Sequence, residues 1–543
     1  MSEEQQAPQL PVLLLKEGTT ESKGKDAQKN NITAAKNVSE IVKTSLGPRG
    51  MDKMIVSPIG DVTITNDGAT ILKEIEIEHP AAKMMVEVAK SVDNEVGDGT
   101  TSAVVIAGAL IEKAEGLLAK NVHPAIIVEG FKEASQKAIA ILRKLAVKID
   151  AEAKDFLNKI ARTSMASKIV SGNSEYLSSI VVDCIAAVSE KTSIGKITVD
   201  MDNIKVEKKP GGSINDSQIV RGIVLDKEIV HGGMPKNIEK AKIALINSAL
   251  EIEKTEFDAK LNINSPDQMQ RFLDEENKIL KSMVDKISSA GANVVLCQKG
   301  IDDTAQHYLA KIGIMAVSRI KESDISKLSK ATGARTITNI EELDATDLGY
   351  SDLVEERKVE TDKWVFVEGC KNPKAISVLI KGGSQRIVDE AERSVHDGLM
   401  TTKDIVEYPY AVLGGGASEA IVAHRIREWS NSLSGRARLA AEKFADAIET
   451  IPIVLAENAG MDPLDAQVQL RARATCAKPK YGVDVLSAKI ADISAEDIYE
   501  PLAVKEHIIN AATEAASMIL RIDNVIAASK SNTPSGPSPS PEG

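Results

Sequence analysis

Aromatic residues are scarce in this chain, and it has no long apolar run. Phe, Trp and Tyr together make up 3% of the 543 residues, so Ala, Val, Ile and Leu must fill the cores, and few rings are present on which nucleic-acid bases stack. The formal net charge of −12 also argues against nucleic acid or an anionic membrane surface as a partner. No stretch reaches the roughly 18 apolar residues of a spanning helix. We therefore expect no nucleic-acid partner and no membrane insertion.

Several common chemical motifs are also missing. The four cysteines, Cys184, Cys297, Cys370 and Cys476, form no Cys-x-x-Cys pair, so neither a local zinc site nor a disulfide framework is suggested. The seven histidines form no His-Glu-x-x-His pattern, and no Gly-x-x-x-x-Gly-Lys-Ser/Thr loop occurs, which argues against a conventional P-loop ATPase. The apolar run 12–15 is too short for a signal peptide. A reducing, cytoplasmic location fits this pattern best.

The length of the chain predicts several domains, because single cores stop growing near about 250–300 residues. With 43% hydrophobic and 27% charged residues, each domain can bury a core. The chain is helix-rich at first, alternates between strand-like and helical runs over about 240–340, and is helix-rich again to about 528. We expect residues 1–26 to be frayed, and the Pro- and Ser-rich residues 529–543 to be disordered.

The middle of the chain has the pattern of βαβ units. Strand-like runs at 243–246, 294–297 and 315–317 are separated by amphipathic stretches, which predicts a compact α/β domain. Within it, Ser265 and Pro266 are typical of a helix start. The apolar stripe of this helix is interrupted by Glu276, so the helix either docks entirely on its sheet or projects at its outer end.

The most informative stretch is Gly97-Asp98-Gly99-Thr100-Thr101-Ser102, which precedes the apolar run 103–111. Asp and Thr before such a run are N-cap residues of a helix. A helix N-terminus attracts anions, the glycines let a ligand approach the backbone, and Asp98 is a hard oxygen ligand suited to Mg²⁺. This predicts a phosphate-and-magnesium loop, although so short a motif on its own more often marks an ordinary helix cap.

Other polar residues also have simple structural interpretations. Asp67 follows a predicted hairpin, and carboxylates at turns usually bond their own backbone. Lys168 interrupts a small and apolar segment, where a solvated lysine is the default explanation. The acidic residues of the helix that contains Asp397 suit a solvated face.

Six motifs in order along the chain resemble the group II chaperonins, the family of archaeal thermosomes and their eukaryotic cytosolic relatives. The motifs are Thr44–Met54, Thr65–Leu72, Val96–Thr101, Gln298–Asp303, Gly414–Ala417 and Leu455–Gly460. The resemblance covers nearly the whole chain. It implies a multidomain α and α/β fold with a helical equatorial domain, a hinge-like intermediate domain and an α/β apical domain.

The resemblance also implies domain boundaries. The equatorial domain takes 1–149 and 405–528, the intermediate domain 150–217 and 370–404, and the apical domain 218–369. A helical protrusion over about 251–280 would form a built-in lid. Subunits of this family assemble into stacked rings that enclose non-native polypeptides, so same-family subunits and unfolded chains are the implied partners.

By the same resemblance, the cofactors are ATP and Mg²⁺. The implied catalytic residues are Asp67 and Asp397, which position the attacking water and the metal shell, and Lys168, which senses the terminal phosphate. The implied metal ligand is Asp98. The implied nucleotide-binding residues are Leu46, Gly47, Pro48, Gly97, Gly99, Thr100, Thr101, Ser102, Gly414, Gly415, Glu500 and Lys505.

The chain departs from the family pattern in three places. Ala166-Ser167 replaces a common Thr-Gly before Lys168, Leu413 replaces a common proline, and the stretch 400–410 differs from the usual connector.

The hypothesis that the resemblance supports is an ATP-hydrolysing chaperonin subunit that encloses and assists the folding of non-native proteins. The alternative is an ATP-independent structural or holdase scaffold, whose loops merely cap helices.

Overall fold

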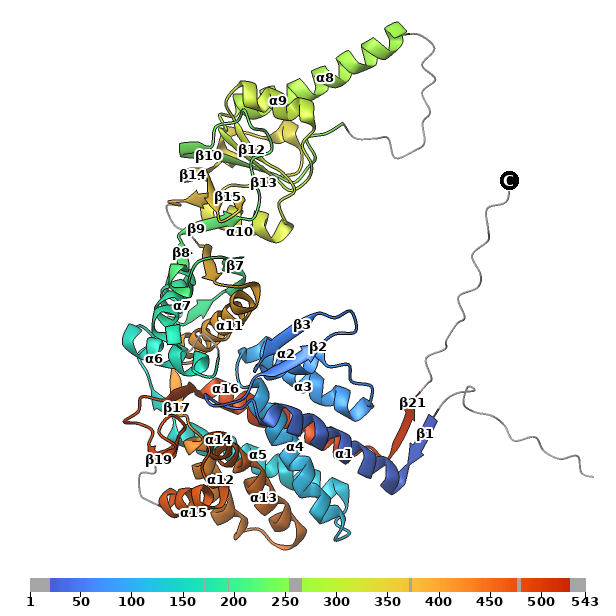
Figure 1. Cartoon of the computed structure of the whole chain (residues 1–543), viewed down its shortest axis with the longest axis vertical. Helices are drawn as coiled ribbons and strands as arrows, with labels where there is room; N and C mark the ends of the chain where they lie inside the picture. The colour runs from blue at the N-terminus through green and yellow to red at the C-terminus, as the bar shows by residue number, and fades with distance from the viewer. Residues whose placement is uncertain are drawn as a thin grey trace, which may run out of the picture.

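The computed structural model describes residues 20–168, 172–193, 195–252, 266–370, 374–475 and 480–527. These residues form three bodies that follow one another along the long axis of the molecule, here called the lower, middle and upper bodies after their places in Figure 1. Each body has its own apolar core. The chain passes from the lower body to the upper body and returns, which confirms the expected multidomain α and α/β fold.

The lower body is helical and contains both ends of the described chain. Its first pass comprises β1 (Thr20–Lys23), α1 (Gly24–Lys43), β2 (Lys53–Val56), β3 (Val62–Thr65), α2 (Gly68–Glu74), α3 (Pro80–Val96), α4 (Thr100–Leu118), α5 (Pro124–Leu145) and β4 (Val147–Lys148). Its second pass comprises β17 (Tyr410–Leu413), α12 (Ala417–Ser430), α13 (Gly435–Ile448), α14 (Thr450–Asn458), α15 (Pro463–Ala474), β18 (Tyr481–Asp484), β19 (Lys489–Asp492), β20 (Tyr499–Pro501), α16 (Leu502–Leu520) and β21 (Asn524–Ala527).

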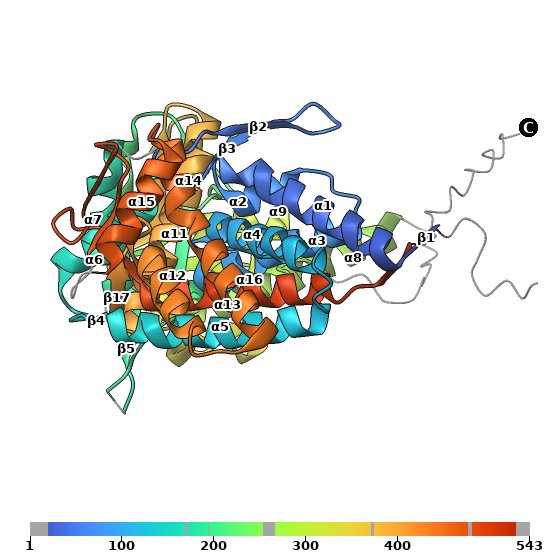
Figure 2. The same ribbon diagram turned by 90° about the horizontal axis from the view of Figure 1, so that it is seen from below.

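Helix α4 lies at the centre of the lower body (Figure 2). Residues 103–111 are apolar on every face and all buried, and a helix that is hydrophobic all round is stable only when other helices surround it. Helices α1, α3, α13 and α16 supply that cover. Because α13 and α16 come from the second pass, the core of this body closes only when the chain returns.

The expectation that residues 1–26 are frayed is wrong for the part that the structure describes. Strand β1 pairs antiparallel with β21, with Thr20 opposite Ala527, and α1 begins at Gly24. The partner strand lies at the far end of the sequence, so local composition gave no sign of it. Residues 529–543, expected to be disordered, lie outside the described residues.

The middle body contains α6 (Lys154–Met165), α7 (Ser174–Val188), β5 (Ser189–Lys191), β6 (Ile197–Val199), β7 (Ile204–Pro210), β8 (Gln218–Val220), β16 (Ile376–Gly382) and α11 (Gln385–Glu407). Strands β7 and β16 pair in parallel, one from each pass of the chain. Helix α11 packs on α6 and α7 and reaches down to the lower body.

The upper body is an α/β unit with β9 (Gly222–Leu225), β10 (Asn237–Ile246), α8 (Pro266–Ser289), β11 (Val294–Cys297), α9 (Asp303–Lys311), β12 (Met315–Val317), α10 (Glu322–Thr332), β13 (Thr336–Ile337), β14 (Gly349–Val359) and β15 (Asp362–Glu368). Its main sheet has the strand order β12-β11-β10-β14-β15-β9. Strands β10, β11 and β12 are parallel, which confirms the predicted βαβ pattern.

Helix α8 begins at Pro266, as predicted, and its outer end projects beyond the sheet (Figure 1). Leu280, Val284 and Ile287 near its inner end are buried, whereas Phe272 and Leu273 are each more than 40% exposed. The projecting arrangement is therefore the correct one of the two alternatives. Of the expected protrusion over 251–280, residues 253–265 lie outside the described part. No helix among the described residues is long and apolar enough to cross a membrane.

Candidate functional site

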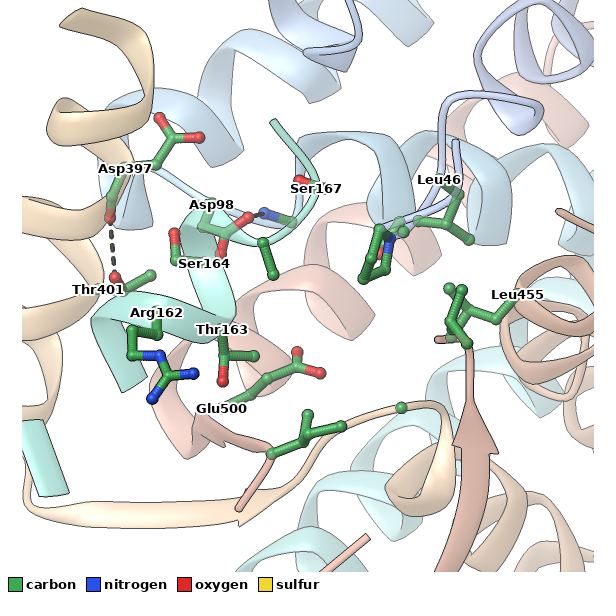
Figure 3. Close-up of a pocket in the computed structure, with 18 of the residues that line it drawn as sticks. Leu46, Asp98, Arg162, Thr163, Ser164, Ser167, Asp397, Thr401, Leu455 and Glu500 are labelled. Carbon is green, nitrogen blue, oxygen red and sulfur yellow. Dashed lines mark hydrogen bonds between the residues drawn. The ribbon is translucent and has the colours of Figure 1, made fainter. Parts of the chain in front are cut away.

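A cavity of about 760 Å³ lies where the lower and middle bodies meet. The residues named from the sequence that line it are Leu46, Gly47, Pro48, Asp67, Asp98, Gly99, Thr100, Thr101, Ser102, Lys168, Asp397, Gly415, Glu500 and Lys505. Gly97 and Gly414 do not line it. Figure 3 shows Leu46 and Leu455 on one side of this cavity and Asp397 and Arg162 on the other.

Asp98 lies in the short turn between α3 and α4, flanked by two glycines in the left-handed region. Gly97 has φ +68° and Gly99 has φ +80°. A Cβ on Gly97 would lie 2.3 Å from Cβ of Met400, and one on Gly99 would lie 2.4 Å from Cδ1 of Ile508. Both backbone conformation and space therefore require glycine on each side of Asp98.

The start of α4 differs from the prediction. The N-cap is Gly99 rather than Asp98 or Thr100, and no side chain caps the helix. The Oδ1 atom of Asp98 instead accepts from the backbone N–H of Gly99 at 2.6 Å. An uncapped helix N-terminus that faces a cavity presents unpaired N–H groups and the positive end of the helix dipole, which suits an anion such as phosphate.

Asp67 caps helix α2 and also faces the cavity. Its interpretation as a turn residue that bonds the backbone is therefore compatible with its interpretation as a residue of the site. Its Oδ2 accepts from the backbone N–H of Thr70 at 2.8 Å and from the Thr70 hydroxyl at 2.7 Å. Its Oδ1 accepts from Oγ1 of Thr100 at 3.2 Å, which ties it to the first turn of α4. Burial alone would raise the pKa of Asp67, but the charge of Lys168 and these hydrogen bonds outweigh it, so the pKa is lowered.

The loop Leu46-Gly47-Pro48 follows α1 and forms another wall. Gly47 has φ +83°, and a Cβ there would lie 2.3 Å from Cδ2 of Leu455. The side-chain amide of Asn458 donates to the main-chain oxygen of Leu46 at 2.9 Å. The second pass of the chain thus supplies the contacts that hold this first-pass loop.

Lys168 and Asp397 come from the middle body and form a buried ion pair. The Lys168 Nζ lies 2.5 Å from Oδ2 of Asp397, and the two residues are only 6% and 7% exposed. The interpretations of Lys168 as solvated and of Asp397 as part of a solvated helix face are both wrong, because each side chain meets its partner only in the folded chain.

The charges around this pair shift both pKa values. Burial would lower the pKa of Lys168, but the carboxylates of Asp397 and Asp67 raise it well above its ordinary range. Burial, with the nearby charges of Asp67 and Asp98, raises the pKa of Asp397 against the opposing effect of Lys168. The cavity thus keeps Lys168 cationic, and a bound divalent cation would favour the ionised form of Asp397.

Glu500 and Lys505 lie at another part of the cavity wall, where β20 leads into α16. The Nζ of Lys505 is 2.5 Å from Oε2 of Glu500 and 2.6 Å from Oε1 of Glu419. Lys505 is therefore held between two carboxylates rather than free to meet a ligand charge. A Cβ on Gly414 would lie 2.7 Å from Oε1 of Glu500, so Gly414 supports this wall without lining the cavity.

Gly415 lines the cavity in a left-handed conformation, with φ +58°. A Cβ there would lie 2.9 Å from the main-chain oxygen of Val483. The close approach of these two backbones shapes the wall between α12 and β18.

Sequence reasoning missed several lining residues, among them Asn66, Arg162, Thr163 and Ser164. The last three lie at the end of α6, in or next to the segment noted for Lys168. Ser164 Oγ is buried and has no hydrogen-bond partner among the described residues. In the sequence, the only sign that Ser164 lines a cavity is that a polar side chain interrupts the apolar stripe of α6.

The donor set of the cavity fits a nucleotide-bound Mg²⁺ better than a metal held by protein alone. No group of three or more His, Cys, Asp or Glu side chains in the described part of the chain is arranged to hold a metal ion. Proteins usually bind nucleotide Mg²⁺ through one or two carboxylates, and phosphates and water complete the shell. Asp98, beside the uncapped start of α4, fits that role.

Comparison with known proteins identifies the family of this chain. The profile of the TCP-1/cpn60 chaperonin family matches residues 38–530. Thermosome subunit alpha of Archaeoglobus fulgidus is 54% identical over 527 residues, which cover 97% of this chain and 96% of the relative. The chain belongs to the TCP-1/cpn60 chaperonin family, in its group II branch. The resemblance read from six motifs is thereby confirmed.

Two further relatives agree with this assignment. Thermosome subunit alpha of Sulfolobus acidocaldarius is 53% identical over 543 residues, which cover 98% of this chain and 97% of the relative. Thermosome subunit beta of Thermococcus kodakarensis is 53% identical over 521 residues, which cover 96% and 95%. As a group II chaperonin, the protein assists the folding of other proteins.

The structure also locates the places where the chaperonin departs from the family pattern. The Asn66 side-chain amide donates to the main-chain oxygen of Ser167, so the substituted Ala166-Ser167 segment still contacts the loop that contains Asp67. Met400 packs beneath Gly97, and Leu413 ends strand β17. These departures lie in the walls and supports of the cavity.

Proposed function

We propose that this chaperonin binds ATP with Mg²⁺ in the cavity, hydrolyses it, and uses the cycle to enclose non-native polypeptides. The observation that carries the proposal is the convergence of Asp67, Asp98, Asp397 and Lys168 on one cavity at the uncapped start of α4. The four residues come from two bodies and from both passes of the chain.

Each residue has a distinct role in the proposed reaction. The N–H groups at the start of α4 and the glycine loops bind the phosphates, and Asp98 holds the Mg²⁺, which neutralises phosphate charge. Asp67 is ionised and orients a water molecule for in-line attack on the terminal phosphorus, and Asp397 helps to position this water and the metal shell. Lys168 places a fixed positive charge beside the transferred group. Phosphoryl transfer depends mainly on such positioning and charge neutralisation.

The three bodies correspond to the proposed domains. For the described residues, the lower body takes the place of the equatorial domain (1–149 and 405–528), the middle body that of the intermediate domain (150–217 and 370–404), and the upper body that of the apical domain (218–369). The bounds differ at two points, because β8 (Gln218–Val220) pairs with β16 and α11 continues to Glu407, so both belong to the middle body. Because Lys168 and Asp397 belong to the middle body, the site is complete only when that body docks on the lower one. Bound ATP would favour this docked state, and α8 would move with the upper body to close the lid.

Assembly into stacked rings of family subunits in the cytoplasm completes the proposal. The relatives are themselves named as subunits. The β2–β3 hairpin stands out from the lower body (Figure 2), with Met54 67% and Ile59 86% exposed, as expected of a surface that a neighbouring subunit covers. The described cysteines, Cys184, Cys297 and Cys370, are free and buried, which suits a reducing compartment.

The test is ATP hydrolysis measured with and without Mg²⁺, together with electron microscopy for rings. We expect turnover that requires Mg²⁺ and particles made of two stacked rings. Protection of a trapped substrate from protease should depend on ATP. Rings that suppress aggregation without any ATP turnover would favour the holdase alternative and refute the proposal.

A further inference from the structure

We infer that Glu390, in helix α11 of the middle body, is a positioning residue that sets the backbone of the Asp67 loop through the hydroxyl of Thr65. The inference rests on the proposed function, because its effect is on the residue that orients the attacking water. Glu390 itself does not line the cavity.

The contact from Glu390 to Asp67 passes through one hydroxyl group. Thr65 Oγ1 donates to Glu390 Oε2 at 3.2 Å, and the backbone N–H of Asp67 donates to the same Oγ1 at 3.1 Å. A hydroxyl can donate one hydrogen bond while accepting another, so Thr65 links the carboxylate to the backbone of Asp67. Thr65 and Glu390 are both fully buried at 0% exposure.

The carboxylate of Glu390 is itself held in place. Arg393, one turn further along α11, donates from Nε to Glu390 Oε2 at 3.0 Å, and its Nη2 lies 2.9 Å from the same oxygen. The hydrogen bond from Thr65 is therefore made to an oriented and charged acceptor, which strengthens it relative to a bond between neutral groups.

The link crosses between two bodies. Thr65 ends β3 of the lower body, whereas Glu390 lies in α11, seven residues before Asp397. Residues seven apart lie two turns apart on the same side of a helix, about 10.5 Å along its axis. A single helix therefore carries Asp397 into the cavity and, from Glu390, fixes the loop that carries Asp67. When α11 is docked on the lower body, the carboxylates of Asp67 and Asp397 are both held in position. When α11 moves away, both carboxylates lose the contacts that position them.

A second contact makes the Asp67 loop sensitive to the same docking. The Asn66 amide donates to the main-chain oxygen of Ser167, the residue before Lys168. The loop 65–67 is thus held by the middle body through two successive side chains. If Glu390 had a purely structural role, it would only neutralise Arg393. Its loss would then leave the position of Asp67 unchanged.

The experiment compares Thr65→Val, which is similar in shape but lacks the hydroxyl, with Thr65→Ser, which keeps it. We expect Thr65→Val and Glu390→Gln each to lower kcat for ATP about tenfold, the effect of losing one well-placed hydrogen bond. The KM for ATP should stay near wild type. The melting temperature should fall in Thr65→Val and in Glu390→Gln, because each substitution leaves a buried polar group without its partner, so kcat is measured well below the melting temperature of each variant. Thr65→Ser should retain most activity, and the double variant Thr65→Val/Glu390→Gln should be no slower than the slower single variant.

The matched control is Glu392→Gln in the same helix, whose carboxylate pairs only with Lys208 among the described residues; its kcat should match wild type. Wild-type kcat in Thr65→Val and Glu390→Gln, beside an active wild-type enzyme, would overturn this inference alone. So would additive effects in the double variant, or equal losses in Thr65→Ser and Thr65→Val. A wild-type protein that hydrolyses no ATP would instead refute the proposed function. Thr65→Val keeps the test decisive if Glu390→Gln folds poorly.

Discussion

Substitution of Asp67 separates its structural role from its proposed role in hydrolysis. Asn keeps one side-chain oxygen, which can still accept from the Thr70 N–H and hydroxyl, while its NH2 group replaces the oxygen that accepts from Thr100. Asn and Asp cap helices about equally well. Asp67→Asn therefore removes the charge and leaves the α2 cap. Asp67→Ala also removes the cap, at an additional cost of about 1 kcal/mol in the free energy of unfolding. The two variants should differ in stability and agree in turnover.

The expected loss of turnover follows from the ionisation of Asp67. Its pKa is lowered because Lys168 and the threonine hydrogen bonds outweigh burial, so it is charged throughout the neutral range. Loss of a positioned carboxylate that orients or activates water typically costs about 100-fold or more. Nucleotide affinity should stay within about threefold of wild type, because the proposed phosphate contacts are at the start of α4 and the glycine loops rather than at Asp67.

The lowered pKa also predicts a pH dependence of stability. A carboxylate whose folded pKa is below its unfolded value stabilises the fold above that unfolded value, about 3.9 for Asp, and the contribution is lost as pH falls through the folded pKa. Asp67→Asn should therefore be less stable than wild type near pH 7, and the difference should shrink below about pH 4.

Three measurements check the Asp67 prediction: phosphate release under saturating ATP, nucleotide binding by calorimetry, and thermal unfolding. Asp285→Asn, at an exposed position of α8 away from the cavity, is the matched control and should behave as wild type. Turnover at the wild-type rate in Asp67→Asn would remove Asp67 from the mechanism. Loss of nucleotide binding in the same variant would mean that Asp67 acts in binding rather than in hydrolysis.

The remaining predictions concern other parts of the molecule. Lys505→Met removes the cation between the buried carboxylate of Glu419 and the partly buried carboxylate of Glu500. We therefore expect a loss of about 3 kcal/mol in the free energy of unfolding, seen as a clearly lower melting temperature; an unchanged melting temperature would contradict this. Burial raises the pKa of Asp404 to about 7, and its Oδ2 has no hydrogen-bond partner among the described residues. The contribution of Asp404 should therefore destabilise the fold increasingly as pH rises from about 4 to 7. Asp404→Asn should raise the melting temperature more at pH 8 than at pH 5; an equal rise at both pH values would argue against a raised pKa for Asp404. Replacing the exposed Met269, Phe272 and Leu273 of α8 with serine should leave ATP turnover within twofold while abolishing ATP-dependent protection of a trapped substrate from protease; retained protection would show that this part of α8 does not close the lid.

The features that the sequence predicted correctly are those that depend on neighbouring residues. The α8 start at Pro266 and the parallel strands of the upper body follow from helix caps and hydrophobic periodicity, which act over a few positions. The six motifs were also sufficient to indicate the family.

Tertiary structure decided the features that depend on contacts between distant segments. The start of α4 is capped by no side chain because Asp98 turns to the Gly99 N–H, although local propensity favoured Asp98 or Thr100 as the cap. Residues 20–23 form a strand only because β21 returns beside them. The environments of Lys168, Asp397 and Lys505 depend on partners between 5 and 229 positions away in sequence. Burial and charge pairing of this kind arise only when both passes of the chain close one core, because no local pattern records which carboxylate a lysine will meet.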